Sequence, residues 1–262
     1  MGKGSTPARG WLGRYYSILV VFALWEAIAR SGLVNPRLFP TLGMIGDQLW
    51  TMLRTQVAFK HAGATLLRVF VGFGIAAVLG IVVGFLMARV RLFGRLLEPA
   101  FSFGYPVPRV ALYPIFIFLF GLGHLSKIVL IVLECLYPVA ISTYHANRAI
   151  DRTYIWSAQN MGASGRQVFL RVIVPAAAPG IFSGLRIALP IALVIAVVCE
   201  MIGATEGLGW LIAYASASLS RSQVFAGVAI IAAIGFALDR LLAAARDRLI
   251  FWERESVSIG FS

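Results

Sequence analysis

Six stretches of the chain are apolar over most of their length, and each is long enough, or nearly long enough, to cross a lipid bilayer. They cover residues 15–31, 63–88, 99–121, 127–146, 179–202 and 223–245. A membrane-spanning helix needs about 20 predominantly apolar residues. Because no water reaches the hydrocarbon core, the backbone there must bond to itself, and each stretch is predicted to be an α-helix. The pattern therefore predicts an all-α integral membrane protein with six transmembrane helices.

The segments between these spans give the predicted protein an orientation. An even number of spans places both termini on one side, so a tail over 1–14, a transmembrane domain over 15–245 and a tail over 246–262 are expected. Fourteen Lys and Arg residues fall in the segments that share a side with the N-terminus or at the adjoining ends of the spans, against six on the other side. Basic residues are enriched in cytoplasmic loops, so both termini are predicted to be cytoplasmic. The uncharged stretch 207–220 is too short to cross and is predicted to form a short outer-surface or re-entrant helix.

The amino-acid composition and the absence of certain motifs exclude several classes of protein. The chain is 60% hydrophobic and 13% charged, with a mean hydropathy of +0.85, which excludes an ordinary soluble domain. The formal charge of +12 is scattered over the ends of apolar stretches, as membrane orientation requires, so no nucleic-acid partner is expected. The sequence holds neither a GxxxxGK[ST] phosphate loop nor an HExxH metal motif, and it predicts no bound cofactor, metal or catalytic residue.

Two pairs of glycines predict close helix packing. Gly80 and Gly84 lie four residues apart in the second span, and Gly180 and Gly184 lie four apart in the fifth. Small residues at this spacing let two helix backbones approach closely within a membrane. The alternative is that glycine is simply common in membrane helices.

The third span contains three prolines, Pro106, Pro108 and Pro114. Proline removes a backbone donor and clashes with the preceding turn, so a kinked or interrupted helix is predicted here. Such an interruption is tolerated only against protein or beside a water-filled path.

The connection between the fourth and fifth spans, residues 147–178, has signals of ordered structure. A first helix is predicted from Asp151 to Met161, with Gly162 in the left-handed conformation that ends it. Ser164 and Gln167 have the spacing of a capping box that begins a second helix, and Pro175 is expected to end the segment. We interpret this helix–turn–helix as a docking element for a soluble partner; the alternative is an amphipathic linker lying on the lipid surface.

The same region carries a family resemblance. The run SAQNMGAS followed by IVPAAAPGIFSGLRIAL resembles the EAA loop of binding-protein-dependent ABC importer permeases, with Gly162 and Pro175 at the family's spacing. Residues 98–127, 184–189 and 199–212, and the stretch around Pro40, are similar to taurine, aliphatic sulfonate and nitrate permeases, so the resemblance covers about residues 35–255. Trp156 stands where the family motif has an acidic residue. The residues that the resemblance assigns to ATPase coupling are Trp156, Ser157, Ala158, Gln159, Asn160, Met161, Gly162, Ala163, Ser164, Arg166, Gln167 and Pro175.

The resemblance implies a fold, an assembly and a function. The expected fold is that of a type I ABC importer permease working as a homodimer in the bacterial inner membrane. Expected partners are a second copy of the chain, separate ATPase subunits that bind the ATP, and an extracytoplasmic solute-binding protein. The implied substrate is a small anion such as a sulfonate, taurine or nitrate. The alternatives are a permease for a thiamine precursor, riboflavin or an aromatic carboxylate, a secondary transporter or channel, and an embedded enzyme.

Ionisable residues inside the spans are candidates for the translocation path. Each costs on the order of 3 kcal/mol at the bilayer centre, so it should face protein or the path. They are Glu26, Arg68, Arg109, Glu134, Arg186 and Glu200. Arg68, Arg186 and Glu200 match residue types of the family, and structural ion pairing is an equal alternative for them. Arg109 and Glu134 depart from the family and are expected to serve substrate choice or to form an ion pair. The predicted path comprises Tyr105, Arg109, Glu134, Arg186 and Glu200.

Overall fold

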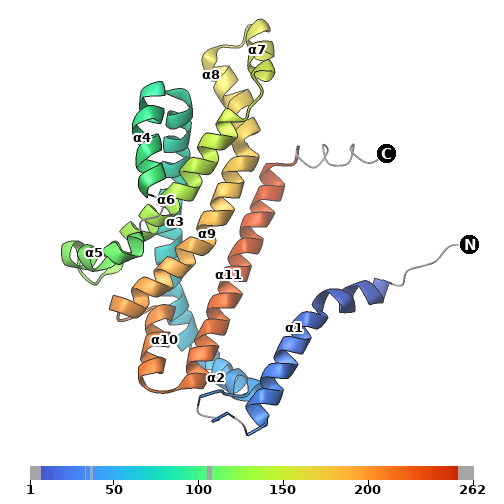
Figure 1. Cartoon of the computed structure of the whole chain (residues 1–262), viewed down its shortest axis with the longest axis vertical. Helices are drawn as coiled ribbons and strands as arrows, with labels where there is room; N and C mark the ends of the chain where they lie inside the picture. Colours follow the sequence, from blue (N-terminus) through green and yellow to red (C-terminus); the bar gives the residue numbers. More distant parts are fainter. Residues whose placement is uncertain (1–6, 33, 36–37, 105–107, 253–262) are drawn as a thin grey trace, which may run out of the picture. The chain divides into compact units, whose positions relative to one another are not determined.

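The computed structural model describes residues 7–32, 34–35, 38–104 and 108–252, and every regular element in them is helical (Figure 1). The longer helices are α1 (Pro7–Arg30), α3 (Val57–Arg89), α6 (His124–Arg148), α9 (Val174–Gly203) and α11 (Arg221–Leu249). The shorter elements are α2 (Leu42–Arg54), α4 (Arg91–Gly104), η1 (Arg109–Leu112), α5 (Tyr113–Phe120), α7 (Arg152–Asn160), α8 (Gly165–Val168), η2 (Phe169–Ile173) and α10 (Leu208–Ala217). The chain divides into two compact units, Met1–Phe59 with Leu211–Ile230, and Lys60–Trp210 with Ile231–Ser262.

Among the residues that the structure describes, four helical segments are long and apolar enough to cross a membrane: Val57–Arg89, His124–Arg148, Gly165–Gly203 and Arg221–Leu249. They contain the second, fourth, fifth and sixth predicted spans. The first predicted span, 15–31, falls on α1, which is helical but is not one of the four. The third, 99–121, is not a single helix, because α4 ends at Gly104 and the next element begins at Arg109. This is the interruption that the prolines predict, although Pro106 itself lies outside the described residues.

The core of the larger unit is built where α6 packs between α3 and α9. Its buried side chains are mostly small or β-branched, and they include Val69, Ala76, Ile131, Val139, Ala188, Ala192 and Ala196. The glycine pairs lie on these contacts, as predicted. A Cβ atom on Gly84 would come within 2.5 Å of the Ala140 carbonyl oxygen, and one on Gly184 within 2.6 Å of the Ser142 Cβ. The α6 backbone therefore approaches both neighbouring helices as closely as only glycine permits.

The prediction that Pro175 ends the segment before the fifth span is wrong. The chain is helical without a break from Gly165 to Gly203, and it passes through Pro175 in the first turn of α9. The five residues before α9, Phe169–Ile173, form a π-helical turn. A wider turn accommodates a residue that cannot donate the usual backbone hydrogen bond, and π-turns of this kind interrupt many helices at functional sites.

In the smaller unit, the end of α1 is tied to the start of α2. The Trp25 indole stacks on Phe39 with ring centroids 3.9 Å apart and donates to the Pro40 carbonyl oxygen over 3.1 Å. Glu26 accepts the Leu42 backbone N–H at 2.8 Å and the Arg30 side chain at 2.6 Å. Glu26 is thus a structural residue that joins two helices.

Candidate functional site

The helix–turn–helix predicted between the fourth and fifth spans is present as α7 and α8. Asp151 caps α7 by accepting the Thr153 backbone N–H over 2.9 Å, and this hydrogen bond lowers the pKa of its carboxyl. Gly162 adopts a φ of 81°, and its N–H donates to the Gln159 carbonyl oxygen over 2.9 Å. A residue with a Cβ is strained in this conformation, so glycine is required where α7 ends.

The second helix begins with the predicted capping box. The Gln167 backbone N–H donates to the Ser164 hydroxyl at 3.4 Å, and the Ser164 N–H donates to the Gln167 side-chain oxygen at 2.8 Å. Behind the turn, Ala158, Val168 and Ile173 form a small core of their own. The two helices are therefore fixed by caps and by packing as one rigid body, which we name the coupling knob (residues 151–173).

One face of the coupling knob exposes large apolar side chains. Met161 is 81% exposed, and Tyr154 and Trp156 are also exposed. Next to them lies a cavity of about 450 Å³, lined by Tyr154, Ser157, Ala158, Met161, Arg171, Val172, Pro175, Ala176 and Trp252. Apolar side chains that a folded chain leaves uncovered beside a groove are typical of a protein-binding surface.

Among the predicted path residues, Glu200 is fully buried at the centre of a hydrogen-bond network. Its carboxylate pairs with Arg68 at 2.5 Å and accepts from the Thr65 hydroxyl at 2.9 Å and the Gly209 backbone N–H at 3.0 Å. Thr65 in turn accepts the Leu208 N–H at 2.9 Å. The network ties the end of α9 and the start of α10 to α3, an arrangement that favours the structural alternative for Arg68 and Glu200.

Arg109 and Glu134, the pair that departs from the family, lie side by side. The Arg109 Nε donates to one Glu134 carboxylate oxygen at 3.1 Å, and a terminal guanidinium nitrogen lies 3.0 Å from the same oxygen. The guanidinium also lies 5.7 Å from the centre of the Tyr137 ring. Both charged side chains are partly exposed. They form the ion pair that was one of the two predicted roles, while Tyr105 lies outside the described residues.

Arg186 forms a third pair, with a partner that the sequence analysis did not single out. Its Nε and terminal nitrogen donate to the two Asp239 carboxylate oxygens at 2.9 and 3.2 Å, linking α9 to α11. Asp239 is an acidic residue within the sixth apolar stretch, and the cost of a charge at that depth was the signal that could have identified it. The predicted path residues that the structure describes thus fall into three separate ionic clusters.

Known proteins resemble this chain along most of its length. Residues 76–250 match the model of the family described as "Binding-protein-dependent transport system inner membrane component". The chain is 34% identical over 244 residues to the taurine transport system permease protein TauC of Escherichia coli (strain K12), covering 91% of this chain and 89% of the relative. It is 31% identical over 243 residues to the putative aliphatic sulfonates transport permease protein SsuC of Bacillus subtilis (strain 168), covering 93% and 88%.

Solved structures show the same fold. An inward-facing structure of the MetNI methionine ABC transporter matches with a TM-score of 0.60 at 21% identity, covering 77% of this chain and 95% of that one. The crystal structure of an amino acid ABC transporter with histidines also matches with a TM-score of 0.60, at 16% identity, covering 77% and 97%. The chain therefore belongs to the binding-protein-dependent inner membrane component family, and it is a permease of the ABC importer type.

Proposed function

We propose that this chain imports a small organic sulfonate or a related oxyanion across the bacterial inner membrane, as a homodimer driven by separate ATPase subunits and supplied by an extracytoplasmic solute-binding protein. Two of its relatives are described as taurine and aliphatic sulfonate permeases. ATP is then the ligand of the partner subunit. The chain itself contributes the translocation path and the element through which ATP hydrolysis moves the helices that line it.

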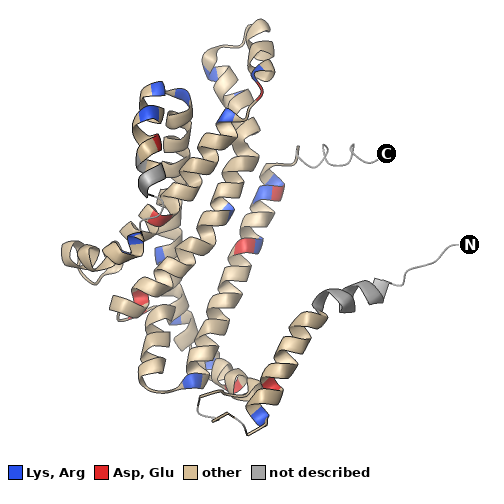
Figure 2. Ribbon diagram, in the orientation of Figure 1, with Lys and Arg blue, Asp and Glu red and all other residues tan. Residues whose placement is uncertain are grey.

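The proposed orientation places the coupling knob in the cytoplasm, with six crossings and both termini inside. Within the larger unit, Lys and Arg residues lie at the ends of α3, α4, α6 and α11 that are on the same side as α7 and α8 (Figure 2). Such residues include Arg89, Arg91, Arg148, Arg246 and Arg248. Enrichment of basic residues on one side is the mark of the cytoplasmic face.

The observation that carries the proposal is that the coupling knob is rigid and is continuous with a membrane helix. From Gly165 the helix runs without a break to Gly203. Close contacts at Gly180 and Gly184 press this helix on α6. When the ATPase subunits close on ATP, a shift of the knob is passed to α9 and α6 as a rigid-body movement, which changes the side to which the path opens.

Arg109 is the side chain best suited to meet an anionic substrate in the path. It begins the 3-10 turn that follows the break after α4, and it is partly exposed. A guanidinium binds the oxygens of a sulfonate through paired N–H donors. In the absence of substrate Glu134 occupies those donors, so substrate and carboxylate compete for the same group.

The experiment is reconstitution of the chain with its ATPase subunit and solute-binding protein in liposomes. We expect taurine or sulfonate uptake that requires ATP and all three components. Gly162→Pro should uncouple ATP hydrolysis from uptake, because proline cannot adopt the left-handed conformation and lacks the N–H that Gln159 accepts. Gly165→Ala is the matched control, because Gly165 is helical and has open space around it.

Two results would oppose the proposal. Uptake by the chain alone under an ion gradient would favour the secondary transporter. Normal coupling in Gly162→Pro would remove the docking role from the knob. If uptake requires ATP but neither taurine nor a sulfonate is carried, the substrate is one of the other classes, such as a thiamine precursor, riboflavin or an aromatic carboxylate.

A further inference from the structure

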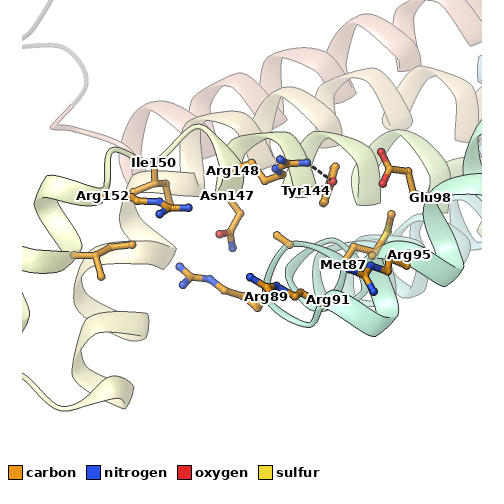
Figure 3. Close-up of a pocket in the computed structure, with 13 residues that line it drawn as sticks. Met87, Arg89, Arg91, Arg95, Glu98, Tyr144, Asn147, Arg148, Ile150 and Arg152 are labelled. Carbon is orange, nitrogen blue, oxygen red and sulfur yellow. Dashed lines mark hydrogen bonds between the residues drawn. The ribbon is translucent and has the colours of Figure 1, made fainter.

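A second cavity, separate from the one beside the exposed face of the coupling knob, lies where four helix ends meet in the larger unit. The C-terminal ends of α3 and α6 and the N-terminal ends of α4 and α7 surround a space of about 510 Å³. Its lining residues are Met87, Ala88, Arg89, Arg91, Gly94, Arg95, Glu98, Tyr144, Asn147, Arg148, Ile150, Arg152 and Ile155. Figure 3 shows the polar side chains of this set gathered around the space between α6 and the α3–α4 turn (Figure 3).

The cavity is strongly basic. Five arginines line it against one carboxylate, Glu98. Among the described residues, none of the five forms an ion pair with a carboxylate; Arg148 donates to the Tyr144 hydroxyl at 2.7 Å. Like charges that converge on one concave space repel each other, and a bound anion relieves that repulsion.

Asn147 supplies an independent indication of a ligand. The residue is only 7% exposed, and its amide nitrogen has no hydrogen-bond partner among the described residues. It lies on α6 between the Arg148 and Arg89 side chains and projects into the space towards the α3–α4 turn (Figure 3). A buried donor left unpaired costs about 1–3 kcal/mol, so the missing partner is a hydrogen-bond acceptor.

The positive-inside rule alone does not explain this arrangement. The rule accounts for arginines near the ends of spans, but it would be satisfied equally by arginines spread over the surface. It also does not explain why a buried amide lacks a hydrogen-bond partner. Here the amide donor and the guanidinium groups line one cavity. Their shared preference is for an oxygen-rich anion, because guanidinium groups match phosphate and related groups with paired N–H donors.

We propose that this cavity binds a tetrahedral oxyanion, with Asn147 and the arginines that line the cavity as its donors. The ligand is either the phosphate of an anionic lipid headgroup or a free phosphate or sulfate ion. Both present the same acceptor oxygens, and the cavity lies where the helix ends meet the predicted membrane surface. A ligand here would bridge α3, α4 and α6 to the first residue of α7, and would thereby steady the base of the coupling knob. The proposal does not depend on the substrate that the permease carries.

The test uses the purified full chain in two arms. In the first, inorganic phosphate is titrated into detergent-solubilised protein at constant ionic strength and binding is measured calorimetrically. In the second, the chain is incubated with phosphatidylglycerol or phosphatidylcholine, and retained lipid is counted by native mass spectrometry. Saturable phosphate binding would identify the soluble ion, and selective retention of phosphatidylglycerol would identify the lipid headgroup. Either result supports the site when the variants below respond.

Three variants make the result specific to the cavity. We expect the double variant Arg91→Gln/Arg152→Gln and the single variant Asn147→Leu each to weaken binding about tenfold or more, since each removes donors to the same anion. Arg248→Gln removes one positive charge from the exposed end of α11, outside the cavity, and should leave binding unchanged. Circular dichroism would establish that each variant is folded. Binding of neither probe, or an equal loss in Arg248→Gln, would overturn the proposal.

Discussion

Two ion pairs of the larger unit join the same residue types and lie in different surroundings. The Arg68 and Glu200 side chains are 3% and 0% exposed, whereas those of Arg109 and Glu134 are 21% and 12% exposed. Both Glu200 oxygens have donors within the protein, but the two Arg109 contacts share one oxygen of Glu134. A saturated, buried pair resists exchange of partners. A partly exposed pair can exchange a partner for a solute, so charge alone does not mark a path residue.

The largest expected effect on stability is that of Glu200→Ala. It removes the buried carboxylate of Arg68 and leaves the partly exposed Glu206, 3.3 Å away, as the remaining counter-charge. It also leaves the Gly209 amide without an acceptor, and loss of one partner from a buried pair costs about 3–5 kcal/mol. The midpoint of thermal unfolding in detergent should fall sharply. Glu134→Ala serves as the matched variant of the exposed pair, and equal midpoints for the two would abolish the contrast.

Thr65→Val should have an intermediate effect. The substitution keeps the shape of the side chain but removes the hydroxyl that donates to Glu200 and accepts the Leu208 N–H, and an unpaired buried group costs about 1–3 kcal/mol. Hydrogen exchange at the start of α10 should become faster. Thr65→Ser retains the hydroxyl and should keep the amides of α10 protected. If amide exchange at the start of α10 is equally fast in Thr65→Ser and Thr65→Val, the hydrogen-bond network does not hold α10 in place.

Arg109→Ala should cost about 1 kcal/mol of stability, because the Arg109–Glu134 pair is partly exposed and such ion pairs contribute little to folding. Its uptake activity should fall about tenfold, the equivalent of one lost charge-assisted hydrogen bond to an anionic substrate. Assembly with the ATPase, measured by co-purification, should be unaffected. Unchanged uptake in a folded variant would exclude Arg109 from the path and make its pair structural as well.

The smallest effect is expected at the fully exposed Asp151 cap of the coupling knob. The Thr153 N–H holds the pKa of this carboxyl below its ordinary value of 3.8. The cap therefore contributes to the stability of α7 in full above pH 3.8, and this contribution is lost as the pH falls through the lower pKa of the folded state. Hydrogen-exchange protection of α7 should decline over that acid range. Asparagine at position 151 can cap the helix but does not titrate, so Asp151→Asn should abolish the acid-dependent loss of protection in α7. If the variant shows the same loss of protection at acid pH, other groups cause it.

Local signals allowed much of the coupling knob to be predicted. Asp151, Gly162 and the Ser164–Gln167 capping box act over a few residues, and each was found where the sequence predicts it. The glycine pairs also predicted close packing, because only a near neighbour requires small residues at that spacing. These features are set by backbone chemistry within one or two turns.

Features that depend on distant partners were not predictable in the same way. Arg68 and Glu200 are 132 residues apart in sequence, and no periodicity connects them. Pro175 was expected to end a helix, but the π-turn before it lets the helix continue from Gly165 to Gly203. The unpaired amide of Asn147 becomes visible only when four helix ends are brought together. Spatial convergence of this kind leaves no signature in a single sequence.

The most direct test of the central claim, that the coupling knob receives the work of a separate ATPase, is disulfide or thiol cross-linking from Met161→Cys. Met161 is 81% exposed, and the native cysteines Cys135 and Cys199 are buried, so the introduced thiol is the reactive one among the described residues. Leu219→Cys is the control, because Leu219 is 72% exposed and belongs to the stretch 207–220 that is predicted to lie on the outer side. The account predicts a cross-link to the ATPase subunit from position 161 that blocks ATP-driven uptake, and none from position 219. Labelling of position 161 from outside the cell, or uptake that continues at full rate with position 161 cross-linked, would contradict it.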